Sequence, residues 1–570
     1  MVDDQYDVVI VGAGADGPVV AWKLGRAGVS VLLLEAGPFH GNAEWPNPHE
    51  KPGGDRSDAV DDLSGALLDE QFTGRELEMI EKFLFGPADH DRGFWLRNFP
   101  GDGALLQNAG VGGTTLHYLG NHPRAYPAAI DEQDHWPIEY ADLIPYYEEI
   151  EAHLEVRPAP QTAKEELFAA GAEAAGWELL DGKNITGPGY RPQPNAIGVP
   201  DERLHVDADY EGDFRYPDLE GDSLALGNIV GNVHPRGAPM ENKAKQASNV
   251  SFVPDALETG KVTIRPNAFV TDVHTTGGTA GDHQATGVTF RDTWQGTNER
   301  VNAEVVVLAA GAIETPRLWL NADLPDTGWV GRGMTIHYPD GVLGFWERDD
   351  LEDRIGKPTI DQHHGQNSAI RFEYPGLGMF QPITSTPAVS ALFGFGASSS
   401  GFTFQHDTTG APWDSFGRLG GQDLKRMYSK YRQLLPIIIL PDDRPHQRNG
   451  VHVSPAVKDE HGPIAQVTFE PSQADLARRD RLAEIAAELL REAGASHIHR
   501  SDSPPTGIHI HSTMAMGKVV DEGCEAYEVD RLFVADHGAL PNGIGGPNPT
   551  NTGQALAART ADQILERYFS

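Results

Sequence analysis

Two histidines and an asparagine near the C-terminal end are the residues best suited to do chemistry. His509 and His511 lie in GIHIHSTMAMG, and Asn548 lies in NPTNT. A neutral imidazole can take a hydroxyl proton near pH 7, and an asparagine amide can donate to the same oxygen without competing for that proton. Histidines two apart, as in this pair and in His497 and His499, share one face of a strand and could instead mark a metal site. No carboxylate stands at a convincing spacing to complete such a site.

A strand and a glycine-rich turn near the N-terminus predict a dinucleotide-binding unit. Asp7 to Val11 is a short apolar run, which predicts one buried strand, and Gly12, Gly14 and Gly17 follow it in G-x-G-x-x-G spacing. Gly12 allows the tight turn, Gly14 lets the backbone approach a pyrophosphate, and Gly17 keeps the next helix close to the sheet. The alternative is an ordinary glycine-rich turn between a strand and a helix.

The residues after this turn favour the dinucleotide interpretation. Pro18 suits the start of a helix and Gly28 suits its end. The strand from Val29 to Leu34 then delivers Glu35, whose carboxylate can accept hydrogen bonds from an adenosine ribose while the helix N-terminus faces the phosphates. Asp16 is a misfit because it puts a carboxylate beside the expected phosphate. We expect Asp16 to point to solvent or to cap the helix.

The rest of the chain contains one further loop of interest and several periodic segments. Paired glycines followed by threonines in GVGGTTLHYLGNHPR, residues 110–124, predict a loop that can lie flat against a planar ligand. Periodicity predicts helices at Gly74–Phe85 and Ser472–Ala493, and Trp136–Val156 is typical of a turn that leads into an amphipathic helix. Strands are expected at Lys261–Val273, Ala285–Arg291, Val301–Gly311, Pro436–Leu440 and Ile464–Phe469. We expect the strand that starts at Val301 to return the chain to the nucleotide-binding sheet.

Length and charge limit the possible architectures and partners. A chain of 570 residues is too long for one core and predicts two closely packed domains, between which the chain crosses more than once. The 83 acidic residues outnumber the 45 Lys and Arg, giving a formal charge of −38, so nucleic acids and anionic membranes are not expected as partners. This excess is typical of a halophilic protein surface, and the alternative is a merely acidic cytosolic enzyme.

The cysteine content limits the cofactors that the protein can use, and the absence of targeting signals bears on its location. With Cys524 as the single cysteine, the chain has no intramolecular disulfide, no CxxCH haem site and no iron–sulfur ligand set. Any redox chemistry therefore requires a bound organic cofactor. No apolar run approaches the roughly 18 residues that span a bilayer, and no export signal precedes the first strand, so we expect a cytoplasmic location.

The acidic excess predicts that stability and activity rise with salt. Molar salt shortens the screening length to about 3 Å. It therefore weakens the repulsion among the acidic side chains that give the chain its formal charge of −38. Thermal melts and activity across a salt series from low ionic strength to molar KCl measure this effect. A melting temperature that does not change with salt would remove support for the halophilic interpretation.

Four motifs together resemble the glucose–methanol–choline (GMC) family of FAD-dependent oxidoreductases. They are the fingerprint at residues 6–38, GGTTLHYLG, GAIETPRLW and the block from residue 507 onward, and they occur in the family's order. The GGTTLHY loop and the NPTNT ending are most similar to the gluconate-dehydrogenase and pyranose-oxidase branch.

The resemblance implies an α/β protein with a Rossmann-like FAD-binding domain and a second, α+β substrate domain built on an antiparallel sheet. The implied FAD-binding domain comprises residues 1–160, 236–335 and 500–570. The implied substrate domain comprises residues 161–235 and 336–499.

The resemblance also assigns roles to residues. The family's H-x-x-G-T-x-R-M-G falls on residues 509–517 and makes His509 the implied catalytic base, although Ser512 and Ala515 depart from the usual Gly and Arg. The family's second active-site residue falls on Asn548. Asn548 could instead be only a helix N-cap before Pro549, and both roles can coexist, because that helix would point its positive end at the flavin. The implied FAD contacts, besides the fingerprint glycines and Glu35, are Ala36, Gly112, Gly113, Thr114, His117, Val270, Ala310, Gly311, Asp536, Pro549 and Thr550.

The function implied is oxidation of an alcohol carbon on a sugar, sugar acid or polyol, with proton abstraction by His509 and hydride transfer to flavin N5. The electron acceptor stays open among oxygen, a quinone and a separate protein. The alternatives are a non-redox FAD lyase of the same fold and an NAD-type nucleotide-binding protein without catalysis.

His117 stands where several members of the family carry a histidine bonded to the 8α carbon of the flavin. The resemblance therefore implies a covalent link between FAD and His117. The alternative is a histidine that only packs or hydrogen-bonds beside the ring.

Overall fold

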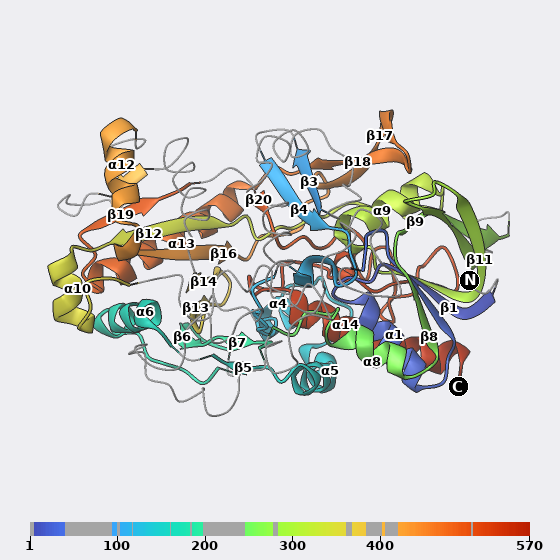
Figure 1. Cartoon of the computed structure of the whole chain (residues 1–570), viewed down its shortest axis with the longest axis horizontal. Coiled ribbons are helices and arrows are strands. Elements are labelled where there is room, and N and C mark those ends of the chain that lie inside the picture. Colours follow the sequence, from blue (N-terminus) through green and yellow to red (C-terminus); the bar gives the residue numbers. More distant parts are fainter. Residues whose placement is uncertain are drawn as a thin grey trace, which may run out of the picture.

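The structure is a computed structural model in which two seven-stranded sheets lie toward opposite ends of the long axis (Figure 1). The described residues are 5–39, 94–99, 103–116, 118–159, 161–182, 185–197, 245–277, 283–360, 368–383, 402–404, 420–502 and 506–570. His117 and the helix expected at Gly74–Phe85 lie outside them.

The first sheet is mostly parallel, and its strand order is β8-β2-β1-β11-β10-β9 with β21 beside the end of β11. Its strands are β1 (Gln5–Val11), β2 (Val31–Leu34), β8 (Val262–Arg265), β9 (Ala268–Thr276), β10 (Gln284–Asp292), β11 (Asn298–Leu308) and β21 (Leu532–Val534). The first half of β11 pairs with β10 in antiparallel fashion, and its second half lies between the parallel strands β1 and β21. The expected return of the chain to the nucleotide-binding sheet is confirmed.

Both faces of the first sheet are covered, which explains why its strands are almost continuously apolar. Val8 and Ile10 face one core, which they share with α1 and α14, while Val9 and Val11 face a second core on the opposite side. The helices at this end are α1 (Gly17–Arg26), α5 (Tyr140–His153), α8 (Phe252–Glu258), α9 (Gly311–Asn321) and α14 (Thr550–Tyr568). Because α14 packs against both α1 and α5, the C-terminal residues are part of the nucleotide-binding unit.

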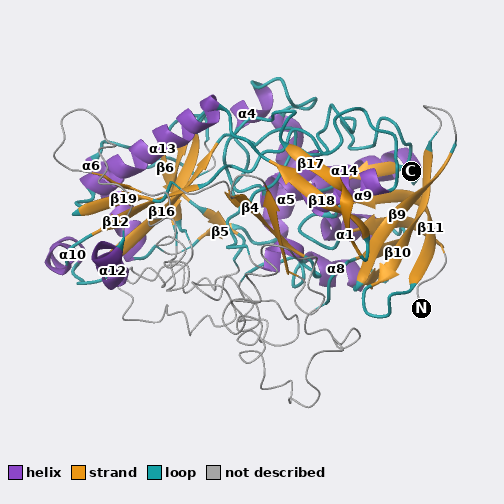
Figure 2. Ribbon diagram, turned by 90° about the horizontal axis from the view of Figure 1, so that it is seen from above, coloured by secondary structure: helices purple, strands orange, loops and turns teal. Residues whose placement is uncertain are grey.

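The second sheet is antiparallel throughout, in the order β15-β19-β12-β16-β14-β13-β6. Its strands are β6 (Gly189–Pro192), β12 (Asp340–Phe345), β13 (Ile370–Tyr374), β14 (Gly378–Pro382), β15 (Phe402–Phe404), β16 (Leu434–Pro441) and β19 (His497–Arg500). The helices α6 (Ala163–Ala174) and α13 (Gln473–Glu492) lie along one side of it (Figure 2). The Ser472 side chain caps α13, so the helix expected from Ser472 is confirmed. An α/β fold with a second, antiparallel sheet is thus confirmed, whereas the domain boundaries stay a prediction.

The remaining elements are small sheets and short helices. They are β3 (Phe94–Phe99), β4 (Gly103–Asn108), β5 (Arg157–Pro158), β7 (Pro194–Asn195), β17 (Gly450–Asp459), β18 (Gly462–Thr468), β20 (Thr506–Gly507), η2 (Gly113–Leu116), η6 (Tyr431–Gln433), η7 (His537–Ala539), α4 (Pro127–Asp131), α10 (Arg348–Ile355) and α12 (Gly421–Ser429). β20 runs parallel to β4, which brings the histidine segment after β20 toward the glycine loop after β4. No helix among the described residues is long and apolar enough to cross a membrane.

Three expected elements differ in the structure. The run from Lys261 to Val273 is two strands, β8 and β9, because the chain turns at Asn267, which has a φ of 57°. The strand expected at Ile464–Phe469 is confirmed as β18, with slightly different bounds, and it pairs with β17 in a separate two-stranded ribbon. The segment from His509 follows the two-residue strand β20 and is not itself a strand, so face-sharing by alternation does not apply to its histidines.

Candidate active site

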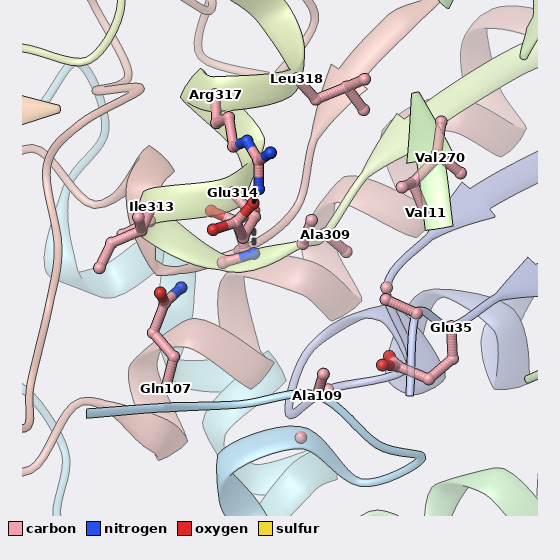
Figure 3. A pocket seen from close by; sticks show the side chains of 18 of the residues that line it. Val11, Glu35, Gln107, Ala109, Val270, Ala309, Ile313, Glu314, Arg317 and Leu318 are labelled. Atoms are coloured by element: carbon pink, nitrogen blue, oxygen red, sulfur yellow. Dashed lines mark hydrogen bonds and ion pairs between the residues drawn. The ribbon is translucent and has the colours of Figure 1, made fainter. Parts of the chain in front are cut away.

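Ends of the first sheet's strands meet α9 and the glycine loop around one pocket, as expected for parallel sheets, which bind ligands at the carboxyl ends of their strands (Figure 3). Figure 3 shows Val11, Glu35 and Val270 at one part of the wall, Gln107 at another, and the ion pair between Arg317 and Glu314 on α9. The pocket therefore draws on segments from residue 11 to residue 537.

Three of the predicted glycines, Gly12, Gly17 and Gly113, have no room for a side chain. Gly12 has a φ of 109°, and a Cβ there would lie 2.3 Å from the carbonyl oxygen of Ala309. A Cβ on Gly17 would lie 2.1 Å from the carbonyl oxygen of Gly12, and one on Gly113 would lie 2.6 Å from Cα of Gly14. The fingerprint turn and the glycine loop thus touch backbone to backbone. Gly12, Gly14 and Gly113 line the pocket, whereas Gly17 does not.

Glu35 lies at the pocket wall and is held there by the backbone. Its carboxylate accepts hydrogen bonds from the N–H groups of Ala13, Gly37 and Gly110, each at 2.9 Å. Burial raises the pKa of Glu35 to about 7, and these N–H donors oppose the rise. A carboxylate has about four acceptor positions, so about one is left for a ribose hydroxyl.

Asp536 also lines the pocket, but protein groups occupy both of its oxygens. One oxygen accepts from the N–H of Gly311 at 3.0 Å and from the hydroxyl of Thr315 at 2.5 Å, and the other accepts from the N–H of Gly538 at 2.7 Å. Burial raises the pKa of Asp536 to about 6. Asp536 therefore ties the start of α9 to the segment after β21 and shapes the pocket through them.

Asp16 contradicts the expectation that it points to solvent or caps the helix. It is buried, its side chain makes no capping hydrogen bond, and one of its oxygens lies 3.5 Å from Nε2 of His537. Burial, and then the charge of Asp536, raise the pKa of Asp16 well above its usual range. A neutral carboxyl can lie beside a phosphate without the repulsion that made Asp16 a misfit in the sequence.

The remaining predicted contacts fall into three groups. Ala36, Thr114, Val270, Ala310 and Gly311 line the pocket. Gly112 lies just behind it, where its N–H donates to the carbonyl of Ala13 at 2.7 Å. Pro549 and Thr550 are not part of the lining, and they begin α14 directly after Asn548.

His509 and Asn548 lie together, although 39 residues separate them in the sequence. The amide nitrogen of Asn548 is 3.1 Å from Nε2 of His509. Burial lowers the pKa of His509 well below its usual range, and the neighbouring His337 and His537 lower it further, so His509 is neutral at pH 7. Since Pro549 occupies the N-cap position of α14, Asn548 is not the cap of that helix.

Two further histidines surround His509. Nδ1 of His337 lies 3.1 Å from Nδ1 of His509, and Nδ1 of His511 lies 3.0 Å from the hydroxyl of Thr335. His337 was not predicted, because it stands alone in GMTIHYP with no partner at a recognisable spacing. Its backbone φ of 55° cannot be seen in a sequence.

The pocket also contains an aromatic stack that the sequence did not indicate. The rings of Phe269 and His461 are nearly parallel, with centroids 3.8 Å apart, and the guanidinium of Arg317 lies 5.4 Å from the Phe269 centroid. His461 belongs to the turn between β17 and β18, so this ribbon closes one part of the pocket.

The metal alternative finds no support in the geometry. Among the described residues, no group of three or more His, Cys, Asp or Glu side chains could hold a metal ion. His497 and His499 belong to β19 in the second sheet, whereas His509 and His511 follow β20 in the small three-stranded sheet.

The residues present fit a dinucleotide cofactor such as FAD. The glycines let the turn, the loop and the segment at Ala309 pack backbone to backbone around the pocket, and a Cβ at Gly12 or Gly113 would push these segments apart. Within the described chain, Oδ1 of Asp16 is buried without a hydrogen-bond partner, and the raised pKa of Asp16 allows the carboxyl to donate. Glu35 keeps acceptor capacity for a sugar hydroxyl at the other part of the wall.

Comparisons with known proteins find relatives of one family. Residues 230–339 and 445–557 match the two profiles of the GMC oxidoreductases. 2-Methyl-1,2-propanediol dehydrogenase from Mycolicibacterium austroafricanum is 27% identical, over 99% of this chain and 96% of its own length. The gluconate 2-dehydrogenase flavoprotein from Pantoea cypripedii is 23% identical, over 99% and 94%. A formate oxidase structure from Aspergillus oryzae RIB40 has a TM-score of 0.61 at 14% identity, over 100% and 99% of the two chains, and shows the same fold.

Proposed function

Because the chain belongs to the GMC oxidoreductase family, we propose that it is an FAD-dependent enzyme that oxidises a CH–OH carbon of a polyol, sugar or sugar acid. The contact between His509 and Asn548 carries the proposal. The unprotonated Nε2 of His509 and the amide nitrogen of Asn548 lie 3.1 Å apart. This pair suits a substrate hydroxyl, which must lose its proton while its oxygen is held in place.

The two side chains divide the work on the substrate hydroxyl. Nε2 of His509 accepts the hydroxyl proton, and the Asn548 amide donates to the same oxygen, so the oxygen is held while its proton leaves. As charge develops on the oxygen, the Asn548 hydrogen bond strengthens. FAD supplies the hydride acceptor when bound.

The cofactor-holding residues are proposed from the pocket lining. Gly12, Gly14 and Gly113 would meet the cofactor through their backbones, and Glu35 would accept from a ribose hydroxyl through its remaining lone pair. The first turn of α14, which starts at Thr550 beside Asn548, adds a positive helix end next to the proposed base.

Substrate and acceptor are proposed only by class. A small alcohol is proposed because the names of two relatives include 2-methyl-1,2-propanediol and gluconate. The electron acceptor is oxygen, a quinone or a separate protein, and a cytoplasmic location stays part of the proposal. The family matches favour redox chemistry over an FAD lyase or a non-catalytic NAD-binding protein.

A visible spectrum followed by a substrate screen tests the proposed function. We expect the purified protein to show a flavin spectrum. Diols, sugars and sugar acids are then screened as substrates with an artificial dye as the electron acceptor. Dye reduction by at least one of these alcohols is the expected result. A colourless protein that binds NAD instead would overturn the proposal.

The covalent link to His117 remains a prediction with its own test. Acid precipitation of the purified protein should leave the yellow colour in the pellet, and the intact mass should exceed that of the polypeptide by the mass of FAD. The matched variant His117→Ala should release its colour. A wild-type supernatant that keeps all of the colour would show that His117 is only a neighbour of the cofactor.

A further inference from the structure

His337 is a buried histidine in direct contact with the proposed base, and the proposed function gives it no task. Its Nδ1 lies 3.1 Å from Nδ1 of His509, and its Nε2 lies 2.7 Å from the carbonyl oxygen of Gly543. We infer that His337 is a positioning residue that fixes which ring nitrogen of His509 carries the proton. This inference rests on the proposed function of His509.

The positions of the protons follow from the hydrogen-bond partners. A carbonyl oxygen only accepts, so Nε2 of His337 must carry the hydrogen that reaches Gly543. In a neutral ring, Nδ1 of His337 is then a lone-pair acceptor, and Nδ1 of His509 must donate to it. Nε2 of His509 is left unprotonated, and this is the nitrogen that faces Asn548.

The surroundings of His337 keep its ring neutral. Burial is the main reason that the pKa of His337 is lowered to about 4; the hydrogen bond to the Gly543 carbonyl opposes this shift, and His537 adds to it. The His511 ring stacks obliquely against it with centroids 4.7 Å apart. Asp443 faces the backbone rather than the ring, because its carboxylate accepts from the N–H of Ile336 at 2.8 Å, and burial raises its pKa to about 8. Among the residues that the structure describes, the hydrogen bonds and ion pairs include no charged partner that competes with His509 for the lone pair of His337.

The backbone around His337 supports a functional reason for its placement. His337, Ser512 and Ile544 have φ values of 55°, 70° and 50°, in the left-handed region that is costly for residues other than glycine. His337 belongs to the chain of hydrogen bonds and Ile544 directly follows Gly543, whereas the Ser512 hydroxyl contacts Thr335, two residues before His337, at 3.0 Å. Strained positions of this kind cluster at sites where side-chain direction matters.

Without His337, His509 has a competing form that cannot act as the base. Its proton can move to Nε2 and donate to Oδ1 of Asn548 after rotation of the amide, which leaves no acceptor for a substrate hydroxyl. With His337 present, that form would place two lone pairs against each other at 3.1 Å. His337 therefore excludes the unreactive tautomer by electrostatic repulsion and stabilises the reactive one by a hydrogen bond.

Two substitutions of His337 separate positioning from packing. Phenylalanine keeps a planar ring but accepts no hydrogen bond, whereas glutamine can accept at Oε1 and donate at Nε2. We expect His337→Phe to slow anaerobic flavin reduction roughly ten- to a hundredfold, as removal of a group that orients a catalytic ligand does. His337→Gln should recover most of the rate, and both holoenzymes should keep their FAD spectrum. His452→Phe, a change of an exposed histidine on β17, is the control and should match the wild type.

A spectroscopic measurement reads the tautomer without activity. In holoenzyme labelled with ¹⁵N-histidine, the His509 signals are identified as those lost in His509→Ala. We expect protonated Nδ1 and bare Nε2 in the wild type and in His337→Gln, and the reverse in His337→Phe. A wild-type His509 protonated at Nε2 would overturn the inference, even if His337→Phe proved too unstable to purify.

The two proposals fail in different ways. If His337→Phe reduces its flavin at the wild-type rate while His509→Ala does not, only the inference on His337 is wrong. If His509→Ala keeps the wild-type rate, the proposed function of His509 is wrong as well.

Discussion

His509→Ala is expected to keep bound FAD and to lose substrate-driven flavin reduction by about a hundred- to ten-thousandfold, the usual effect of removing a general base. Its Nε2 is the bare ring nitrogen that faces the Asn548 amide, and burial keeps the ring neutral at pH 7. Anaerobic stopped-flow bleaching of the flavin measures the loss directly. The visible spectrum before mixing shows that the cofactor is still present.

The rate of flavin reduction in Asn548→Ala is compared with that in His509→Ala. We expect a smaller loss, because the amide only donates to the oxygen that His509 deprotonates, and the base itself stays in place. His452→Ala, on the exposed side of β17, should leave the rate unchanged. Equal rates in His509→Ala and the wild type would exclude His509 as the base.

Gly12→Ala is expected to abolish most FAD binding and to destabilise the protein. The added Cβ would lie 2.3 Å from the carbonyl oxygen of Ala309, and the φ of 109° is strained for alanine. Overpacking and backbone strain together should lower the free energy of unfolding by about 2 to 5 kcal/mol. The ratio of flavin to protein absorbance and a thermal melt measure the two effects.

Gly28→Ala is the matched control, since Gly28 also has a positive φ, 91°, but a Cβ there meets nothing within 4 Å. Only the backbone strain remains in this variant, about 1 to 2 kcal/mol, and FAD binding should persist. A Gly12→Ala protein with the full complement of FAD would show that the fingerprint turn tolerates a side chain and does not touch the cofactor.

The parts of the protein that follow local rules could be predicted from the sequence. The turn at Gly12, the strand that ends in Glu35 and the helix capped by Ser472 depend on neighbours within a few residues, and each occurs as expected. The resemblance to a family supplied what local rules cannot, namely that His509 and Asn548 would meet. The 3.1 Å contact agrees with that expectation.

The features that sequence reasoning missed depend on distant segments. Asp16 is buried because His537, 521 residues later, lies over it, and no pattern near Asp16 indicates this. The role of Glu35 was only partly foreseen, since the N–H of Gly110 from another loop takes part of its carboxylate. His337 reaches His509 only through a left-handed backbone conformation that a histidine rarely adopts.

The central place of β11 also has a consequence for how the protein is made. Its neighbours β1 and β21 are far apart in the sequence, at Gln5–Val11 and Leu532–Val534, so the first sheet cannot be completed until the ribosome has translated β21. At about 5 to 20 residues per second, the apolar strand β1 waits roughly 25 to 100 seconds for β21. Nascent chains thus spend that time with an unfinished sheet edge, the condition under which chaperones bind.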